Sequence, residues 1–398
     1  MVVKAGYKQT DAGVIPEDWD VKTITNFSPL QRGFDLPIYQ YKPGPFPVVY
    51  SNGILRKHVK AMVKGPGVVT GRSGTIGKIQ FIENDYWPHN TTLWVTNFKG
   101  NIPKFVYYLY QRIGFDRFSS GSGVPTLNRN DVHTFRIAIP PPSEQRTIAT
   151  ALSEADLHIS SMEQVIAKKR DIKQAAMQEL LTGIRRLNGF KDEWEKISFA
   201  DLADENIKWS IIGGPFGSNL IASDYVAEGV RIIQLQNIGD GIFHDDYAIY
   251  TTEKKADELL SCNIYPGEII LSKMGDPVAR ACFVPKNDRR YIMASDGIRL
   301  VVDEKCHDKK FVHDYINSEN FRKKAIEAST GSTRQRIGLG DLKQLPLVVP
   351  SRLEQRAIAT VLSDMDAELT ALEQQRDKMK NIKQGMMQEL LTGRIRLL

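Results

Sequence analysis

The sequence predicts an α/β (α+β) protein with two similar globular domains separated by two long antiparallel coiled-coil helices. Two motifs, each occurring twice at a separation of 210 residues, are the main reason. Glu-Gln-Arg-x-Ile-Ala-Thr-x-Leu-Ser begins at Glu144 and Glu354, and Ile-Lys-Gln-x-x-Met-Gln-Glu-Leu-Leu-Thr-Gly begins at Ile172 and Ile382. The 44-residue copies starting at Glu144 and Glu354 are identical at 24 positions. An internal repeat of this kind sets the architecture, here a pseudo-twofold one.

The expected division has four parts, in the order domain, helix, domain, helix. They are a first globular domain at 1–143, a first helix at 144–187, a second globular domain at 188–350 and a second helix at 351–398. The helices are much more alike than the domains. This contrast indicates a constant frame that carries two variable parts.

The first helix is expected to follow Pro140–Pro142, because successive prolines cannot continue a helix, and Ser143 can cap it. Its apolar residues recur at alternating steps of three and four: Ile148, Leu152, Ala155, Ile159, Met162 and Ile166. This is a heptad seam, the pattern of coiled-coil packing. The helix is expected to end at Leu-Leu-Thr-Gly, where Gly183 suits the C′ position.

The second helix is expected to follow Pro350. Ser351 and Glu354 form the capping-box pattern at its start, and Gly393 stands at its end. The same seam recurs at Ile358, Leu362, Met365, Leu369, Leu372 and Met379. Two helices with matching seams, separated by a domain, most simply pair with each other, and the returning chain makes the pair antiparallel.

The last turn of each helix is richer in apolar residues than one seam requires. We therefore predict that a partner protein docks there, on Met177, Leu180, Leu181, Met387, Leu390 and Leu391. Because the motif is duplicated, two copies of one partner could bind in pseudo-twofold fashion. The alternative is that the helices serve only as an internal scaffold.

The two globular domains read as diverged copies of one module. Pro66–Lys78 and Pro266–Asp276 each read as a strand, a tight glycine turn with a basic residue, and the beginning of a second strand. Both domains end in an apolar run that leads into prolines.

Charge and loop composition indicate DNA as a ligand. Residues 1–143 have a formal net charge of +8, whereas residues 188–350 have one of −4, so the first domain is the better candidate polyanion binder. Asn and Gln can read adenine, Arg and Lys can read guanine, and Ser and Thr suit either base. The predicted DNA contacts of the first domain are Arg32, Arg56, Lys57, Arg72, Ser73, Thr75, Lys78, His89, Asn90, Thr91, Asn128 and Arg129. Those of the second domain are Ser218, Asn219, Gln234, Gln236, Asn237, Lys273, Arg280, Ser332, Arg334 and Arg336.

No motif of an enzyme or a metal site is evident, so we expect a binding protein without catalytic residues. The Gly71–Lys78 loop fails the phosphate-loop pattern because Arg72 and Ile79 stand where Gly and Ser or Thr are needed. The histidines lack metal-ligand spacing, and the three cysteines have neither zinc spacing nor a catalytic context. No apolar run approaches the roughly 18–20 residues of a membrane span, and no signal peptide precedes the chain. A reduced, cytoplasmic setting is therefore expected.

The repeated helices, together with Gly13–Trp19, Gly71–Lys78 and Ser120–Asn130, resemble the specificity subunits of type I restriction–modification systems. The second domain departs from the last two patterns at Met274–Pro277 and Arg334–Ile337. The resemblance implies two target recognition domains, each reading one half of a bipartite site in double-stranded DNA, with the coiled coil setting the spacer.

The resemblance also implies partners. Two modification subunits would bind S-adenosylmethionine and methylate adenine N6, and restriction subunits would join the complex and use ATP and Mg²⁺. No cofactor is expected in this chain itself. Three other interpretations are a stand-alone DNA-binding regulator, a bifunctional restriction enzyme and a scaffold that joins two proteins without binding DNA. Missing catalytic motifs and the lack of spare length argue against the bifunctional enzyme.

Overall fold

The computed structural model describes residues 4–120, 125–331 and 334–397. The chain divides into two compact units, of which unit 1 is Met1–Gln164 with Leu372–Leu398, and unit 2 is Val165–Ala371. The long helices α4 (Pro142–Leu180) and α9 (Arg352–Leu390) each contribute to both units. The structure therefore does not separate helices from domains as the expected division does, because each unit contains one globular part and half of each helix.

The larger sheets of unit 1 share seven strands: β4 (Leu30–Arg32), β5 (Pro43–Tyr50), β6 (Gly53–His58), β7 (Gly67–Gly71), β8 (Ile79–Ile82), β9 (Trp87–Pro88) and β10 (Thr92–Val95). A four-stranded antiparallel sheet has the order β4-β10-β7-β8. A three-stranded sheet has the order β6-β5-β9, with β5 antiparallel to β6 and parallel to β9.

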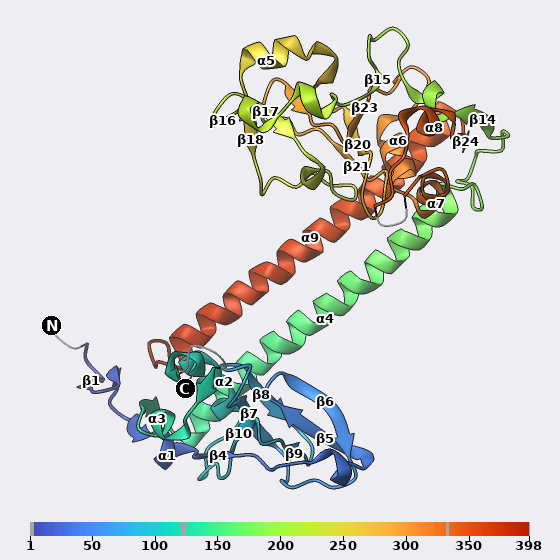
Figure 1. Ribbon diagram of the computed structural model, residues 1–398. Coiled ribbons are helices and arrows are strands. Elements are labelled where there is room, and N and C mark those ends of the chain that lie inside the picture. The colour runs from blue at the N-terminus through green and yellow to red at the C-terminus, as the bar shows by residue number, and fades with distance from the viewer. Residues whose placement is uncertain (1–3, 121–124, 332–333, 398) are drawn as a thin grey trace. The chain divides into compact units, whose positions relative to one another are not determined.

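Short pairs and helices complete unit 1. The pairs are β1 (Tyr7–Thr10) with β2 (Gly13–Pro16), β3 (Asp20–Thr23) with β13 (Arg136–Ile139), and β11 (Ser119–Ser120) with β12 (Thr126–Leu127). The helical segments are α1 (Ile24–Phe27), α2 (Pro103–Ile113), α3 (Arg129–His133), η1 (Ile38–Gln40) and η2 (Phe115–Phe118). Pro103 suits the first position of α2, and Phe105, Leu109 and Ile113 at four-residue steps give that helix a buried face. This face covers β7 and β8 (Figure 1).

Unit 2 contains eleven described strands: β14 (Glu195–Ser198), β15 (Ile211–Gly213), β16 (Tyr225–Val226), β17 (Val230–Ile233), β18 (Ile249–Thr251), β19 (Asn263–Ile264), β20 (Ile269–Ser272), β21 (Ala281–Phe283), β22 (Tyr291–Met293), β23 (Gly297–Leu300) and β24 (Pro346–Val349). They form a four-stranded sheet, β15-β23-β20-β21, a five-stranded sheet, β16-β18-β17-β22-β19, and the pair β14-β24.

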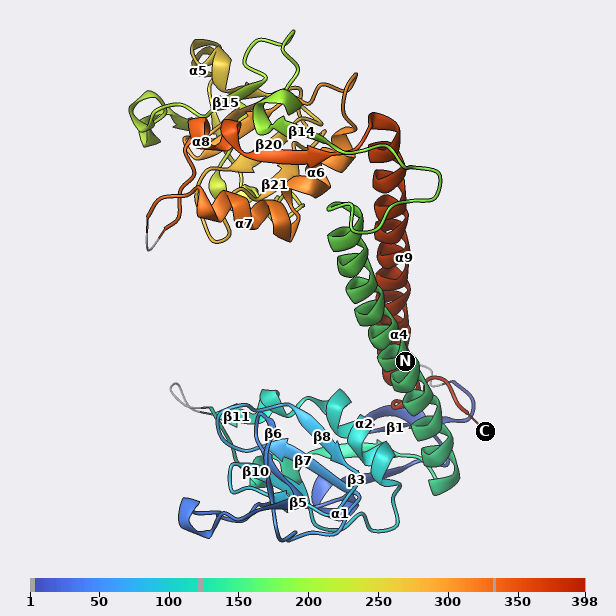
Figure 2. The ribbon, with the colours of Figure 1, turned by 90° about the vertical axis from the view of Figure 1, so that its right-hand side faces the viewer.

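The helices of unit 2 are α5 (Glu253–Glu258), α6 (Lys309–Ile316), α7 (Glu319–Glu327) and α8 (Leu339–Gln344), with short turns η3 (Phe199–Leu202), η4 (Gly217–Asn219), η5 (Ala222–Asp224), η6 (Leu235–Asn237) and η7 (Leu260–Cys262). α6 packs beside β21 (Figure 2). Strands β20 and β23 are wholly buried, as expected of strands covered on both faces.

The two units repeat one topology. The sheet β4-β10-β7-β8 of unit 1 corresponds strand for strand to β15-β23-β20-β21 of unit 2. In the second sheet of each unit, β5 or β17 pairs antiparallel with one neighbour and parallel with β9 or β22. The prediction of two similar α/β modules is confirmed at the level of strand order.

The long helices pair antiparallel within each unit. In unit 1, Asp156 contacts Lys383 (2.5 Å) and Glu163 contacts Lys380 (2.7 Å). In unit 2, Lys169 contacts Glu368 (2.7 Å), and Lys173 contacts Asp366. Partner numbers rise along α4 as they fall along α9, which is the antiparallel order that the matching seams predict.

The repeated Glu and Arg residues close each unit. The Arg396 Nε donates to Glu144 Oε1 (2.7 Å) in unit 1, and the Arg186 Nε donates to Glu354 Oε1 (2.6 Å) in unit 2. Both glutamates are buried. The segment after one long helix therefore binds the first turn of the other helix, in the same way in both units.

The repeated Gln residues and the terminal glycines have structural roles too. Gln145 Nε2 donates to the Pro140 carbonyl (3.0 Å), and Gln355 Nε2 donates to the Pro350 carbonyl (2.8 Å), so both amides tie the helix start to the preceding strand. Gly393 has φ of +71°, and a Cβ there would lie 2.6 Å from Pro16. The left-handed backbone that the sequence predicts at Gly393 is thus confirmed.

Candidate nucleic-acid interface

Equivalent backbone contacts gather the polar loops of each unit at one end of its four-stranded sheet. In unit 1, the Arg72 N–H donates to the Thr91 carbonyl (2.8 Å), and the Leu127 N–H donates to the Arg72 carbonyl (2.8 Å). Three loops that the sequence singled out are thereby joined: the hairpin after β7, the segment before β10 and the segment before α3.

Unit 2 repeats these contacts with different residues. The Lys273 N–H donates to the Asp296 carbonyl (2.7 Å), and the Ile337 N–H donates to the Lys273 carbonyl (3.0 Å). Lys273 thus takes the place of Arg72, and Asp296 takes that of Thr91. The sequences of these loops differ, so the equivalence rests on the backbone and not on motifs.

The loop after the edge strand is also equivalent in the two units. The Gly33 N–H donates to the Thr92 carbonyl (3.0 Å), and the Gly214 N–H donates to the Gly297 carbonyl (2.8 Å). A Cβ at Gly33 would lie 2.2 Å from the His89 carbonyl oxygen, and one at Gly214 would lie 1.9 Å from that of Ala294. Only glycine permits this approach, which brings the edge loop beside the segment that precedes β10 or β23.

In unit 1 this edge loop forms an exposed polar cluster. Arg32 makes an ion pair with Asp35 (2.9 Å), and the Asn90 amide donates to the same carboxylate. Asp35 was not predicted, although it stands three residues after Arg32. It orients two candidate base-reading side chains without burying them.

His89 is half-buried beside this cluster. Its ring lies 4.3 Å from that of Tyr50, and Nδ1 lies 3.1 Å from Thr91 Oγ1. Desolvation lowers the pKa of His89 below its ordinary value, opposed by Asp35 and assisted by Arg32. The ring is therefore neutral at pH 7, so His89 can offer a hydrogen bond rather than a charge.

The remaining predicted residues of unit 1 fall into two groups. Ser73, Thr75 and Lys78 belong to the hairpin between β7 and β8, and Lys78 Nζ donates to the Asn52 carbonyl (3.0 Å). The exposed Asn128 and Arg129 begin α3. The exposed Arg56 and Lys57 lie instead on β6 in the other sheet, where Arg56 stacks over the Tyr41 ring. The described contacts do not join Arg56 and Lys57 to the loop cluster.

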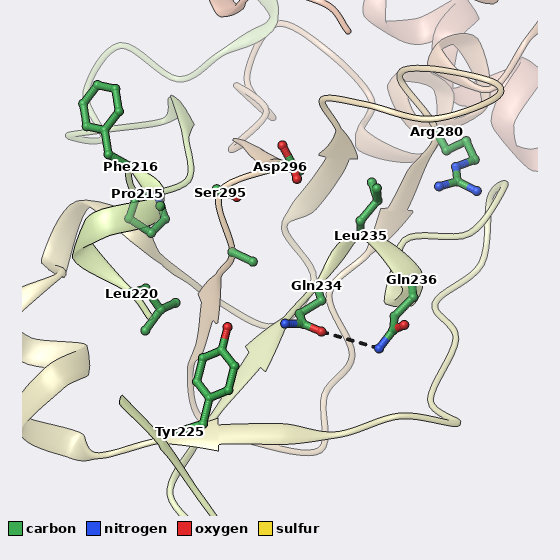
Figure 3. A pocket seen from close by; sticks show the side chains of 12 residues that line it. Pro215, Phe216, Leu220, Tyr225, Gln234, Leu235, Gln236, Arg280, Ser295 and Asp296 are labelled. Carbon is green, nitrogen blue, oxygen red and sulfur yellow. Dashed lines mark hydrogen bonds between the residues drawn. The ribbon is translucent and has the colours of Figure 1, made fainter. Parts of the chain in front are cut away.

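A cavity of about 460 Å³ lies among the loops of unit 2 (Figure 3). Gln234, Gln236, Arg280 and Asp296 contribute its polar groups. Its apolar walls are Pro215, Phe216, Leu220, Leu235, Tyr225 and Ala294. Ser218 and Asn219 are exposed on η4, next to Phe216 at the rim.

Arg336 and Arg334 lie near the cavity in sequence and in contact pattern. Arg336 forms an ion pair with Asp296 (2.9 Å), and Arg334 is exposed. The predicted contact Ser332 lies outside the described residues. The sequence did not point to Phe216, Tyr225 or Asp296, and only the exposed aromatic between glycines at Phe216 gave a signal.

Asn237 has a structural role that differs from the predicted DNA contact. Its side chain is 1% exposed, and Oδ1 accepts from the Gln234 N–H (2.9 Å). Nδ2 donates to the carbonyls of His244 (2.9 Å) and Tyr247 (2.8 Å). With these groups already bonded inside the protein, Asn237 shapes the loop that presents Gln234 and Gln236.

The predicted partner surface at the helix ends also needs correction. Leu180 and Leu181 are buried in the core of unit 2, and Leu390 and Leu391 are buried in that of unit 1. Met177 and Met387 are partly buried against the same cores. The excess of apolar residues arises because each helix end packs against both the other helix and a globular part. A partner cannot reach these leucines.

Among the described residues, no group of three or more His, Cys, Asp or Glu side chains could hold a metal ion. Within the same residues, no helix combines the length and apolar character needed to cross a membrane.

Comparison with known proteins adds family relationships. The family described as "Type I restriction modification DNA specificity domain" matches residues 16–174 and 237–381. The MjaVIII type I restriction enzyme specificity subunit of Methanocaldococcus jannaschii is 22% identical over 419 residues, covering 98% of this chain and 96% of the relative.

Solved structures show the same fold. The S subunit of a type I restriction–modification system from M. genitalium aligns with a TM-score of 0.57 at 14% identity, covering 94% of this chain and 96% of that one. A chain from a structural study of complex assembly and conformational transition in a type I system aligns with a TM-score of 0.61 at 15% identity, covering 96% and 99%.

Proposed function

Because this chain belongs to the type I restriction modification DNA specificity family, we propose that its two units each read one half of a bipartite site in double-stranded DNA. The chain is the DNA specificity subunit of a type I restriction–modification complex. The observation that carries the proposal is the repeated loop cluster. The same backbone contacts gather polar, sequence-divergent loops in both units, as expected of two readers with different targets.

The chemistry of the loops suits base recognition. Arg72 and Asn90 in unit 1, and Gln234 and Gln236 in unit 2, can each make paired hydrogen bonds to a base edge. The surplus of positive charge in residues 1–143 adds attraction to phosphates. We assign base contacts to these loops and place Arg56 and Lys57, on the other sheet, with phosphate contacts.

The two long helices are proposed to set the spacer between the half-sites. Each is continuous over 39 residues and belongs partly to unit 1 and partly to unit 2. A helix rises by about 1.5 Å per residue and resists stretching, so its length can act as a ruler.

We further propose that two modification subunits dock on exposed faces of these helices and methylate adenine N6. Ile172 and Ile382 occupy equivalent positions of the repeat and are 44% and 45% exposed, unlike the leucines eight and nine residues later. S-adenosylmethionine, and ATP with Mg²⁺ for restriction, would bind the partner subunits. The complex would act in the cytoplasm, where it meets DNA.

The test is a map of N6-methyladenine across the genome of cells carrying this gene and its neighbouring modification gene. The same map is made after deletion of this gene alone. We expect a split motif that is methylated in the first strain and lost in the second, because the modification subunit alone lacks the reading domains.

Reintroducing the gene on a plasmid should restore the motif, which controls for effects of the deletion on neighbouring genes. An unchanged map, with both proteins present by immunoblot, would rule out the modification role. A stand-alone regulator or a protein scaffold would then be the remaining interpretations.

A further inference from the structure

Arg280 stands out among the arginines of unit 2 because it has no protein partner. Its Nε is buried without a hydrogen-bond acceptor, and no described residue forms an ion pair with its guanidinium. By contrast, the buried Arg299 contacts Glu268 (2.6 Å), and the buried Arg322 contacts Asp240. Asp296, which shares the cavity with Arg280, is already bound to Arg336 (2.9 Å).

The hairpin between β20 and β21 holds Arg280 at the cavity wall. The Arg280 N–H donates to Ser272 Oγ (2.9 Å), and its carbonyl accepts from the Ser272 N–H (2.7 Å). The preceding Ala279 has φ of +59°, an unfavourable value for a residue with a Cβ. Gly275 has φ of +129°, and a Cβ there would lie 3.3 Å from Arg280 Nη2, so glycine leaves room for the guanidinium.

The equivalent position in unit 1 is also cationic. Lys78 immediately precedes β8, as Arg280 precedes β21. Lys78 Nζ donates to the Asn52 carbonyl, which lies in the loop after β5. Arg280 is beside the corresponding loop after β17, at Leu235 and Gln236, but makes no such bond (Figure 3). The same place in the fold thus holds a satisfied cation in unit 1 and an unsatisfied one in unit 2.

We infer that Arg280 reads a guanine in the half-site of unit 2, with the base edge entering the cavity; this rests on the proposed function. An unpaired guanidinium in a partly buried site needs two acceptors in its plane, and guanine O6 and N7 provide them. A phosphate also offers two acceptors, but the walls of this cavity do not suit it. Pro215, Phe216, Leu220 and Tyr225 are apolar, and Asp296 carries a negative charge.

A guanine fits both properties. Its ring faces are apolar and can lie against Phe216 or Tyr225, and Asp296 can accept from the N4 amino group of the paired cytosine. Gln234 and Gln236, which lie within hydrogen-bond reach of each other (3.4 Å), provide further donors and acceptors beside it. The cavity therefore recognises a G·C pair.

Arg280→Lys is the decisive variant because it keeps the charge and removes the two-pronged donor. Methylated motifs are mapped for wild type, Arg280→Lys, Arg280→Ala and the control Arg289→Ala, whose exposed side chain lies outside the cavity. We expect both Arg280 variants to lose the preference for guanine at one position, by roughly 5- to 150-fold. All other positions, and the whole motif of Arg289→Ala, should stay as in wild type.

A second measurement does not depend on the variants folding. Binding of the wild-type complex with its modification subunits is measured on duplexes in which each guanine of the motif is replaced in turn by 7-deazaguanine, which lacks N7. One replacement in the half-site of unit 2 should weaken binding by about tenfold, the size of one lost base contact.

Three outcomes would overturn the inference while leaving the proposed function intact. The motif could contain no guanine in the half-site of unit 2. No 7-deazaguanine replacement there could matter. Arg280→Lys could keep the full motif while Arg280→Ala lowers methylation evenly at all sites, which is the behaviour of a phosphate contact. Failure of the proposed function looks different, because wild type itself would then produce no split motif.

Discussion

At the scale of single residues, the repeated motifs are explained by closure contacts inside each unit. Arg396 binds Glu144 and Asp18, and its guanidinium lies over the Trp19 ring. The hydrogen bond from Arg396 holds the pKa of Asp18 below its ordinary value, and the two carboxylates raise that of Arg396. Trp19 Nε1 also donates to Glu144 (2.9 Å). One arginine near the end of the chain therefore satisfies a buried carboxylate at the start of α4.

Arg396→Ala should lower the free energy of unfolding of unit 1 by about 2–4 kcal/mol. Removing the partner of a buried carboxylate costs several kcal/mol, and the partial exposure of Arg396 reduces that cost. Urea unfolding followed by tryptophan fluorescence measures the change.

Arg394→Ala is the matched control for that prediction. Arg394 pairs with Glu389 (2.9 Å), and both side chains are exposed. Its loss should cost less than about 1 kcal/mol. Equal losses for the two variants would contradict the closure role of Arg396.

At the scale of elements, burial separates residues of one helix that look alike in sequence. The Leu-Leu ends of α4 and α9 form parts of the two cores, whereas Ile172 and Ile382 remain exposed. An aspartate at Leu180 or Leu390 would therefore unfold a core, and lost assembly in such a variant would say nothing about docking.

The double variant Ile172→Asp with Ile382→Asp should prevent the modification subunits from binding while the chain stays folded. Each change places a charge on an apolar surface that a partner would cover. Co-purification with a tagged modification subunit measures binding, and circular dichroism measures folding.

The control for the double variant changes two exposed glutamines of the same motif, Gln174→Asp with Gln384→Asp. These add the same charges elsewhere on the helices and should leave co-purification largely intact. Full binding by the isoleucine variant would place the docking surface elsewhere.

At the scale of the whole molecule, the repeat couples two readers through two shared helices. Inserting four residues in the middle of α4 adds about 6 Å of helix, and coiled coils tolerate four-residue insertions as local unwinding. The spacer in the methylated motif should grow by about one or two base pairs, at roughly 3.4 Å each, with both half-sites unchanged.

The control insertion places the same four residues after Asn287, in an exposed turn between β21 and β22. It should change neither spacer nor half-sites. If the α4 insertion altered a half-site and left the spacer as it was, the helices would not be the ruler.

The sequence by itself determined the architecture, because the repeat and the two heptad seams are local patterns that burial preserves. It also predicted several of the loops that meet at the interface, such as those at Arg72 and Thr91, since Gly-, Asn- and Ser-rich turns between strands are recognisable without a fold.

Only the tertiary structure decided which polar residues are available and which apolar residues are covered. Asn237 is consumed by three internal hydrogen bonds, Leu181 is enclosed by a core, and Arg280 is left without a partner. Each outcome depends on contacts between segments far apart in the chain. The equivalence of Lys273 with Arg72 likewise resides in backbone hydrogen bonds, which do not depend on side-chain identity and so leave no trace in the sequence.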